Sequence, residues 1–145
     1  MTPSKSSNFW LLKSEPETYS FQRLLKEKKT NWDQVRNFQA RNALRAAKKG
    51  DLALIYHSGD ERALVGVAEV IKEAYPDPDP EMPGDWVQID LKAVEALARP
   101  ISLKEIKAHP GLTDLPLIKQ SRLSCMPITR KHFETLVQLS EKKAP

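Results

Sequence analysis

Residues 32–37 bring an aromatic ring, an amide and a guanidinium together within one short segment. Trp32 begins this segment, Arg36 and Asn37 end it, and Arg41 adds a second cation soon afterwards. An aromatic face stacks on any nucleobase, an amide pairs with a base edge, and a guanidinium holds a phosphate through two hydrogen bonds. These residue types therefore favour nucleotide recognition. A structural alternative stays open, in which Trp32 fills the core and Arg36 pairs with a nearby acid.

Polar side chains also follow two apolar runs, at positions where strand ends often carry binding sites. The first run leads to Lys13 and Ser14, and a later run leads to His57 and Ser58. A cation, two hydroxyls and an imidazole in these positions could contact a ligand. An exposed strand end and a structural histidine are the alternatives, and they are the commoner explanations of such a pattern.

Near the C-terminal end, Ser121 and Ser124 alternate with apolar side chains as far as Met126. Cys125 lies in this run and is the one cysteine of the chain, which excludes an intrachain disulfide and a cysteine-based zinc site. As a nucleophile it would need a general base and a lowered pKa, and the neighbouring sequence supplies neither. We therefore expect no cysteine chemistry, no bound metal and no cofactor.

Length and composition are those of one folded domain. The 145 residues are 40% hydrophobic and 29% charged, which is enough to bury one core. The chain contains no glycine-rich phosphate loop, no G-x-S-x-G motif and no apolar run near the roughly 20 residues of a membrane span. Residues 1–7 lack the apolar centre of a signal peptide. We expect one domain over 1–145 with its core at about 8–140, cytoplasmic for a bacterial-type chain and nuclear for a eukaryotic one.

Charge is divided unevenly along the chain, although the net charge is only +4. Residues 1–50 hold 11 basic and 4 acidic side chains, residues 51–100 hold 4 and 11, and residues 101–145 hold 8 and 4. This division predicts that the two basic ends converge around one site while the acidic middle is largely turned away. Three unrelated solvated surfaces are the alternative.

Hydrophobic patterning predicts five strands. Residues 86–93 alternate cleanly, as a half-buried antiparallel strand does, whereas residues 63–74 are apolar on both faces, as in a central strand. A proline-rich loop separates the two. Long antiparallel strands in so short a chain favour an α+β fold with a sheet curled toward a small barrel. The expected strands cover 8–12, 52–57, 63–74, 86–93 and 121–128.

Capping residues and apolar stripes predict four helices around this sheet. Thr18 or Ser20 would open the first helix, Ser102 the third and Thr129 the last, because their side chains can accept from free backbone N–H groups. In the first helix Phe21, Leu24 and Leu25 would form the inner stripe. Segments 31–37 and 111–118 fit neither period and are expected to be irregular. The expected helices cover 20–28, 38–48, 102–109 and a segment that begins after 129.

Taken in order, the motifs of the chain resemble the EVE domain family of the PUA-like superfamily. The ordered set carries the resemblance, which spans about residues 8–140. Gln34, where the family pattern suggests glycine, and Phe38, where tyrosine is common, depart from it. Gln34 bears on the backbone, because glycine tolerates a positive φ better. The matching stretches are FWLLKSEP at 9–16, WDQVRNFQARN at 32–42, KGD at 49–51, YHS at 56–58, VGVAEV at 65–70, AYPD at 74–77, WV at 86–87, RP at 99–100 and QSRLSCMP at 120–127.

The resemblance implies a PUA-like fold, in which a curled, mostly antiparallel sheet or small barrel with flanking helices holds a nucleobase pocket. It implies a non-catalytic module that recognises a modified base in nucleic acid, chiefly a modified cytosine such as 5-methylcytosine in DNA, or a base in RNA. Lys13, Arg36 and Arg41 would hold phosphates. The base pocket would be formed by Trp10, Ser14, Trp32, Val35, Asn37, His57, Ser58, Ser124 and Met126.

Two other classes of function stay open at this point. An enzyme acting on nucleotides or nucleic acid would use His57 as general acid or base beside Ser58 or Cys125. A small-molecule or protein-binding module would need neither turnover nor nucleic acid. The sequence also leaves open which base modification is recognised and whether the protein is a monomer, and it predicts no membrane partner.

Overall fold

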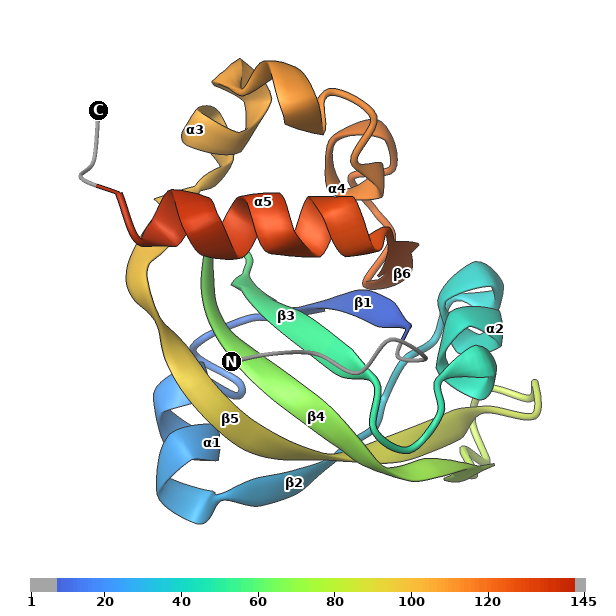
Figure 1. Cartoon of the computed structure of the whole chain (residues 1–145). Helices are drawn as coiled ribbons and strands as arrows, with labels where there is room; N and C mark the ends of the chain where they lie inside the picture. Colours follow the sequence, from blue (N-terminus) through green and yellow to red (C-terminus); the bar gives the residue numbers. More distant parts are fainter. Residues whose placement is uncertain (1–7, 143–145) are drawn as a thin grey trace.

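Six strands form the centre of the computed structural model, which describes residues 8–142. Hydrogen bonds arrange them in the order β2-β5-β4-β3-β1-β6; β1 and β3 are parallel, and the other neighbours are antiparallel. The sheet curls strongly, but β2 and β6 remain its two edges (Figure 1). The predicted α+β curled sheet is therefore confirmed, without closure into a barrel. Residues 1–7, whose polarity argued against a signal peptide, lie outside the described range. The strands are β1 (Phe9–Ser14), β2 (Lys29–Trp32), β3 (Leu52–His57), β4 (Ala63–Pro76), β5 (Val87–Ser102) and β6 (Cys125–Ile128).

The long pair β4 and β5 gives the sheet its curl. Their pairing shifts register at several points, and such bulges bend a ladder and increase its twist. The alternation predicted for 86–93 is present, with Ile89 and Leu91 fully buried, but β5 continues to Ser102. It accommodates Pro100 because β2 pairs only with residues 89–92, and no other strand of the described chain pairs on that side of Pro100.

Five α-helices of the described chain surround the sheet. Helix α5 crosses one end of it, while α1 and α2 lie along its other sides (Figure 1). The predicted caps are confirmed: Ser20, Ser102 and Thr129 each accept a backbone N–H from the first turn of their helix. None of the helices within residues 8–142 has the length and apolarity needed to cross a bilayer. The helices are α1 (Phe21–Glu27), α2 (Phe38–Ala46), α3 (Leu103–Ala108), α4 (Pro116–Lys119) and α5 (Arg130–Ser140), with a 3-10 turn at Pro110–Leu112.

Three short segments differ from the prediction. β2 occupies the start of the expected loop 31–37, since four residues are too few for alternation to reveal an edge strand. Helix α4 and the 3-10 turn occupy the expected loop 111–118, each beginning at a proline whose fixed φ suits a first helical turn. The expected strand 121–128 shortens to β6, which lies at the sheet edge as its proline requires.

Helix α1 is anchored to the sheet by Phe21, whose ring packs against Gly66 of β4. A Cβ at position 66 would fall within the space of that ring, so the absence of a side chain there provides the seat for Phe21. Leu24 is also fully buried, whereas Leu25, predicted for the same stripe, is exposed. The contact between Phe21 and Gly66 fixes where α1 stands relative to β4.

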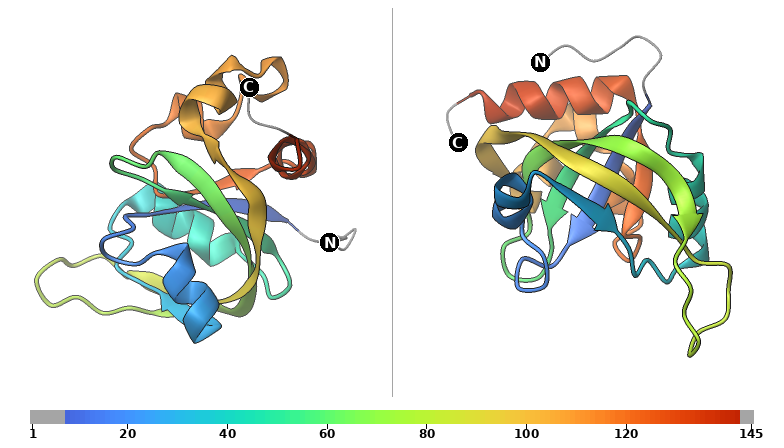
Figure 2. Two further views of the ribbon diagram at one scale, coloured as in Figure 1. Left: turned by 90° about the vertical axis from the view of Figure 1, so that its left-hand side faces the viewer. Right: turned by 90° about the horizontal axis from the view of Figure 1, so that it is seen from below.

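The loop between β4 and β5, residues 77–86, projects from the body of the molecule (Figure 2). Its prolines keep it out of the ladder, as predicted. Gly84 and Asp85 have positive φ values of 151° and 37°, so the chain turns sharply before Trp86. Trp86 is buried and its Nε1 donates to the Met82 carbonyl oxygen at 2.6 Å. The loop is therefore ordered by its own tryptophan.

Candidate functional site

A cleft of about 630 Å³ opens between the end of β1, helix α1, strand β2 and the segment after β2. The antiparallel pairing of β1 with β6 brings the loop before β6 to the same place; the Lys13 N–H donates to the Ser124 carbonyl oxygen at 2.9 Å. Segments from both ends of the sequence thus share one site. The cleft is lined by Lys13, Ser14, Thr18, Tyr19, Arg23, Glu27, Thr30, Asn31, Trp32, Asp33, Gln34, Val35 and Ser124.

Trp32 and Tyr19 are the aromatic residues of the cleft. Their rings meet edge to face, with centroids 6.4 Å apart and planes at 87°. Trp32 is only 8% exposed, so most of its indole packs in the core. Within residues 8–142 its Nε1 has no hydrogen-bond acceptor, yet no fully buried side-chain N or O atom there lacks a partner. The indole N–H of Trp32 is therefore open to solvent, in a side chain that lines the cleft.

Tyr19, Arg23 and Glu27 form a hydrogen-bonded group on the α1 side of the cleft. The Tyr19 hydroxyl donates to Glu27 Oε1 at 2.6 Å, and Arg23 Nε donates to Glu27 Oε2 at 3.1 Å. The Arg23 guanidinium also lies 4.9 Å from the centre of the Tyr19 ring. Hydrogen bonds from Tyr19 and then Arg23 lower the pKa of Glu27. Glu27 is therefore held as a carboxylate beside the cleft.

The end of β1 contributes a partly buried cation and a hydroxyl. Lys13 Nζ donates to the Ser121 carbonyl oxygen at 2.6 Å, and burial lowers the Lys13 pKa because a charged amine loses hydration there. The Ser14 hydroxyl donates to the Tyr19 carbonyl oxygen at 2.6 Å, so only its lone pairs are left for a ligand. With Arg23 balanced by Glu27 and Asp33 also present, the cleft holds charges of both signs.

The segment after β2 is tied to the projecting loop by carboxylates of that loop. Gln34 has φ of 61°, the left-handed conformation in which the family pattern suggests glycine. Its N–H donates to Asp77 Oδ2 at 2.8 Å. Arg36 reaches Asp77 through Nη1 and Asp79 through Nε, both at 3.0 Å. The hydrogen bond from Arg36 lowers the pKa of Asp79. The two loops therefore support one another through Arg36.

Four of the predicted pocket residues do not line the cleft and have structural contacts elsewhere. Trp10 is 6% exposed and donates from Nε1 to Asp51 at 2.9 Å, so it belongs to the core. His57 is 1% exposed: Nε2 accepts the Phe21 N–H at 2.9 Å, and Nδ1 lies 3.0 Å from Glu61. Met126 is fully buried.

Asn37 is the fourth, and it caps α2: its Oδ1 accepts the Ala40 N–H at 2.9 Å. Asparagine is well suited to this capping role, and the predicted contact of Asn37 with a base edge stays a prediction. Arg36, predicted to bind phosphate, is instead occupied by Asp77 and Asp79. The structural alternative considered for Arg36 is thus the one the structure supports.

Five predicted residues do meet in the cleft, namely Lys13, Ser14, Trp32, Val35 and Ser124. Ser58 is half-buried and joins β1 through its N–H to the Ser14 carbonyl oxygen at 3.0 Å, but it does not line the cleft. Tyr19, which precedes α1, and Arg23 and Glu27 of α1 were not predicted as site residues. The spacing of four residues between Arg23 and Glu27 was a usable signal, since positions i and i+4 share one side of a helix.

A second, smaller hollow of about 310 Å³ lies between the start of α2 and the loop after α4. Asn37 and Gln39 line one side, and residues 119–123 line the other. Lys119, the last residue of α4, and Arg122 of the following loop are both exposed. Because Ser121 of the same loop accepts from Lys13, the hollow and the cleft are neighbours.

The predicted distribution of charge is half right. The basic first and last segments do converge, as the bond from Lys13 to Ser121 demonstrates. The acidic middle is not turned away, since Asp77 and Asp79 bind the segment that carries Trp32 and Gln34. Within residues 8–142, His, Cys, Asp and Glu side chains nowhere gather in groups of three that could hold a metal ion.

The sequence matches a known family over nearly its whole length. A family model described as the EVE domain matches residues 8–139. Thymocyte nuclear protein 1 of Homo sapiens is 36% identical over 170 aligned positions, which cover 94% of this chain and 76% of the human protein. Thymocyte nuclear protein 1 of Danio rerio is 32% identical and covers 92% of this chain and 72% of its own length.

Solved structures extend the likeness to three dimensions. A protein of Agrobacterium tumefaciens superposes with a TM-score of 0.88 at 36% identity, over 96% of this chain and 97% of that one. The human protein in complex with DNA that contains 5-methylcytosine superposes with a TM-score of 0.87 at 34% identity, over 95% and 100%. A YTH domain of Zygosaccharomyces rouxii in complex with N6-methyladenosine RNA gives 0.60 at 18% identity, over 99% and 93%. At that identity the YTH likeness concerns the fold alone.

Proposed function

The chain belongs to the EVE domain family, and on this premise we propose that it binds nucleic acid and holds one modified base, a modified cytosine in DNA foremost, in the cleft beside Trp32. The observation that carries the proposal is the open indole N–H of Trp32 in a cleft that also holds an aromatic ring, cations and carboxylates. A structural relative of 34% identity was solved with DNA containing 5-methylcytosine. A base would reach the cleft by leaving its stack or from a single strand.

Aromatic and apolar side chains would hold the body of the base. Tyr19 offers ring surface beside the exposed edge of Trp32, and stacking of a base on an aromatic side chain is worth about 1–3 kcal/mol. Val35 lines the same cleft and offers an apolar contact for a methyl group. One added methyl is discriminated by roughly 1–3 kcal/mol in an apolar pocket. The expected preference for the modified base is therefore moderate.

The carboxylates of the cleft favour a base that carries an exocyclic amine. Glu27 and Asp33 line the cleft, and a carboxylate accepts a hydrogen bond from the N4 amine of cytosine. Thymine and uracil present a carbonyl oxygen at that position, which a carboxylate would repel. The Trp32 N–H and Arg23 are donors for the remaining acceptors of the base. This combination points to cytosine rather than to the other pyrimidines.

Phosphates would be held by cations around the cleft. Lys119 and Arg122 are exposed on either side of Ser121, which accepts from Lys13, and they replace Arg36 in this role. Arg41 keeps its predicted role, because its bonds go to the Gly84 carbonyl oxygen and the Asn42 side chain and leave its charge available. Affinity should fall with salt, as it does when phosphate contacts release counterions.

A non-catalytic role agrees with the state of the candidate catalytic side chains. Both ring nitrogens of His57 are engaged, by the Phe21 N–H and by Glu61. Cys125 is fully buried and burial raises its thiol pKa, the reverse of what an attacking thiolate needs. Neither residue lines the cleft.

The test is a titration of matched oligonucleotides with 5-methylcytosine or cytosine at one position, in DNA and in RNA. Wild-type protein should prefer the modified DNA, and Trp32→Ala should lower affinity about tenfold. Because this variant also removes a core side chain, circular dichroism checks that it is folded, and Trp32→Phe, which keeps a ring in the core, is titrated beside it. Equal affinity of wild type and Trp32→Ala for a bound oligonucleotide would place the base elsewhere. Binding of free 5-methylcytidine as tight as that of the oligonucleotide would instead identify a small-molecule module.

A double variant that removes two positive charges tests the phosphate contacts separately. Lys119→Ala with Arg122→Ala should weaken binding of every sequence and reduce the salt slope by about two. Lys104→Ala with Lys107→Ala removes the same charge from α3, on a surface that lines neither the cleft nor the 119–123 loop, and should change little. Equal effects of the two double variants would contradict a specific phosphate track.

A further inference from the structure

Phe38 is a large apolar side chain that the fold leaves in solvent. It is the first residue of α2 and is 57% exposed. Its ring stacks on the buried Trp86, with centroids 5.0 Å apart and planes at 19°. Trp86 is in turn fixed by its hydrogen bond to the Met82 carbonyl oxygen. The molecule therefore holds an exposed aromatic ring in one orientation, on a rigid support.

The outer face of the Phe38 ring is open. The Arg41 guanidinium carbon lies 4.9 Å from the Phe38 centroid and 6.0 Å from the Trp86 centroid. If Arg41 covered the outer face of Phe38, its distance to Trp86 would approach the sum of the first distance and the ring spacing. The shorter observed distance places Arg41 beside the stack. Gly84 also lies beside it, since a Cβ at that position would touch both rings.

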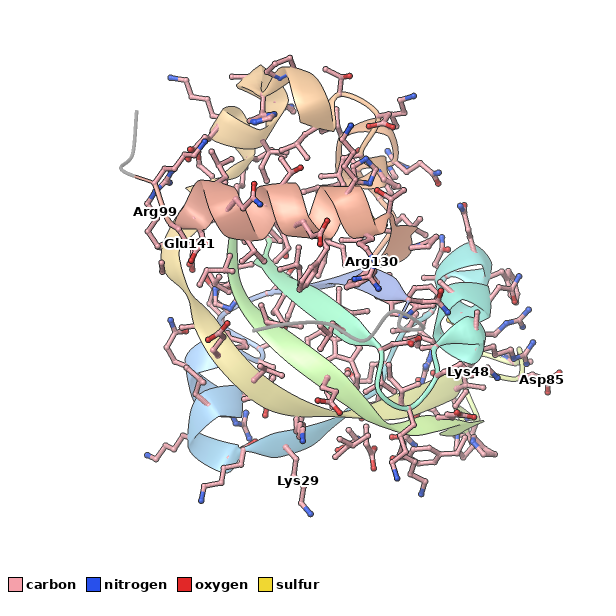
Figure 3. All side chains as sticks on the ribbon, viewed as in Figure 1. Lys29, Lys48, Asp85, Arg99, Arg130 and Glu141 are labelled. Atoms are coloured by element: carbon pink, nitrogen blue, oxygen red, sulfur yellow. The ribbon has the colours of Figure 1, made fainter. Side chains whose placement is uncertain are left out.

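Arg41 flanks this ring, and Arg45 lies one turn further along α2 against the same loop. Arg41 donates to the Gly84 carbonyl oxygen at 3.2 Å, and Arg45 donates to the Asp85 carbonyl oxygen at 3.0 Å. In the described part of the chain, no carboxylate lies within ion-pairing distance of either guanidinium. Asp85 stands at the outer margin of the molecule beyond α2 (Figure 3). An aromatic face with adjacent unpaired guanidinium groups suits a nucleotide, whose base stacks and whose phosphate is anionic.

The same short segment connects this ring to the cleft. Gln34 and Val35 line the cleft, and Phe38 follows three residues later. Arg36 lies 5.4 Å from the Trp86 centroid and bonds to Asp77, which also accepts from the Gln34 N–H. The Asp77 N–H also donates to the Trp86 carbonyl oxygen at 2.8 Å, so Asp77 and Arg36 join the cleft wall to the support of Phe38.

We propose that Phe38, with Arg41 and Arg45, forms a second nucleic-acid contact, here called the Phe38 platform. The open face of Phe38 stacks on a base that flanks the one held in the cleft, and the two guanidinium groups take the adjoining phosphate. This inference rests on the proposed function, because the flanking base belongs to the same strand. The platform adds affinity for a strand of several nucleotides and contributes nothing to binding of a single nucleoside.

The test combines protein variants with missing bases. Phe38→Leu keeps an apolar cover on Trp86 but removes the stacking face, whereas Phe38→Tyr keeps both. Each protein is titrated with an oligonucleotide carrying 5-methylcytosine and with a set in which one flanking nucleotide at a time is abasic. Wild type and Phe38→Tyr should lose about tenfold at one abasic position. Phe38→Leu should bind the intact strand about tenfold more weakly and lose nothing further at that position, since the two changes remove one contact.

The outcomes separate the two proposals. If wild type binds the intact strand and no abasic position weakens binding, the platform is wrong and the cleft proposal stands. If Phe38→Leu binds like wild type, or if its loss adds fully to that of every abasic position, the platform is also wrong. If wild type binds none of the strands, both proposals fail. Arg41→Gln, which leaves the Phe38 ring in place, should weaken the intact strand and reduce the salt slope by about one.

Discussion

Trp10 and Trp32 are buried to nearly the same extent, yet Trp10 belongs to the core and Trp32 lines the cleft. Trp10 is 6% exposed and its N–H donates to the buried Asp51 carboxylate. Trp32 is 8% exposed and its N–H has no acceptor within residues 8–142. The comparison teaches that burial does not separate a core tryptophan from a site tryptophan. The two are distinguished by whether the indole N–H has a hydrogen-bond acceptor, because buried polar groups are almost always paired.

The largest expected effect comes from removing the acceptor on the Trp10 side. The Asp51 carboxylate accepts from Trp10 Nε1, from the Asn8 N–H and from the Lys48 N–H. Asp51→Ala leaves these donors unpaired, and we expect the free energy of unfolding to fall by about 3–5 kcal/mol. Urea unfolding measures it, with the exposed Asp60→Ala as control. A loss under about 1 kcal/mol would mean that Asp51 does not anchor Trp10.

The second effect sets the two tryptophans against each other directly. Trp32→Phe keeps a ring but removes the open N–H, so affinity for the modified strand should fall about fivefold while stability changes by less than about 1 kcal/mol. Trp10→Phe should do the opposite, because it removes one of the two donors to Asp51 Oδ2 and leaves only the Lys48 N–H there. Binding and urea titrations on the same two proteins decide the matter. If both variants changed affinity and stability in the same way, the two tryptophans would not differ in role.

A smaller effect tests the backbone beneath Trp32. Gln34 adopts φ of 61°, where a side chain is strained and glycine is not. Gln34→Gly keeps the N–H that bonds to Asp77, and it should raise the free energy of unfolding by up to about 1 kcal/mol. Gln39→Gly in α2 is the matched control and should lower it by about 1 kcal/mol. Destabilisation by both glycines would show that Gln34 contributes a side-chain contact.

The smallest effect is a pH dependence confined to the loop clamp. The hydrogen bond from Arg36 lowers the Asp79 pKa in the folded state, so the clamp contributes fully above the ordinary aspartate pKa of about 3.9. That contribution is lost as pH falls through the lower folded value. The difference in urea midpoint between wild type and Asp79→Asn should therefore be present at neutral pH and narrow below about pH 4. If the difference in urea midpoint stayed constant across this pH range, the ion pair between Asp79 and Arg36 would not contribute to stability.

Much of the fold followed from patterns that repeat over several residues. The alternation of 86–93 and the caps at Ser20, Ser102 and Thr129 each depend on chemistry within a few residues, so local sequence was sufficient. β2 and α4 are four residues each, which is shorter than either period needs to become visible. Their existence depends on neighbours far away in the sequence, such as β5 for β2.

The site was less predictable because several of the expected site residues are bound by side chains that lie far away in the sequence. Arg36 was expected to bind phosphate, but it meets Asp77 and Asp79, 41 and 43 residues away. Trp10 was expected in the pocket, but Asp51 lies 41 residues away in the sequence and beside it in space. Residue type predicted what these side chains could do, while topology decided which of those possibilities was used.

Gly66 carries a consequence for reading the effects of mutations in this protein. It has no side chain and does not line the cleft, yet any Cβ there would collide with Phe21 and displace the start of α1. Arg23 and Glu27 would move with that helix, and so would the hydrogen bond that Tyr19 donates to Glu27. A survey of variants scored only by binding would therefore rank Gly66 among the ligand contacts. In such a survey, every substitution at Gly66 would reduce binding, because only a residue without a side chain leaves room for Phe21 and keeps α1 in place beside the cleft.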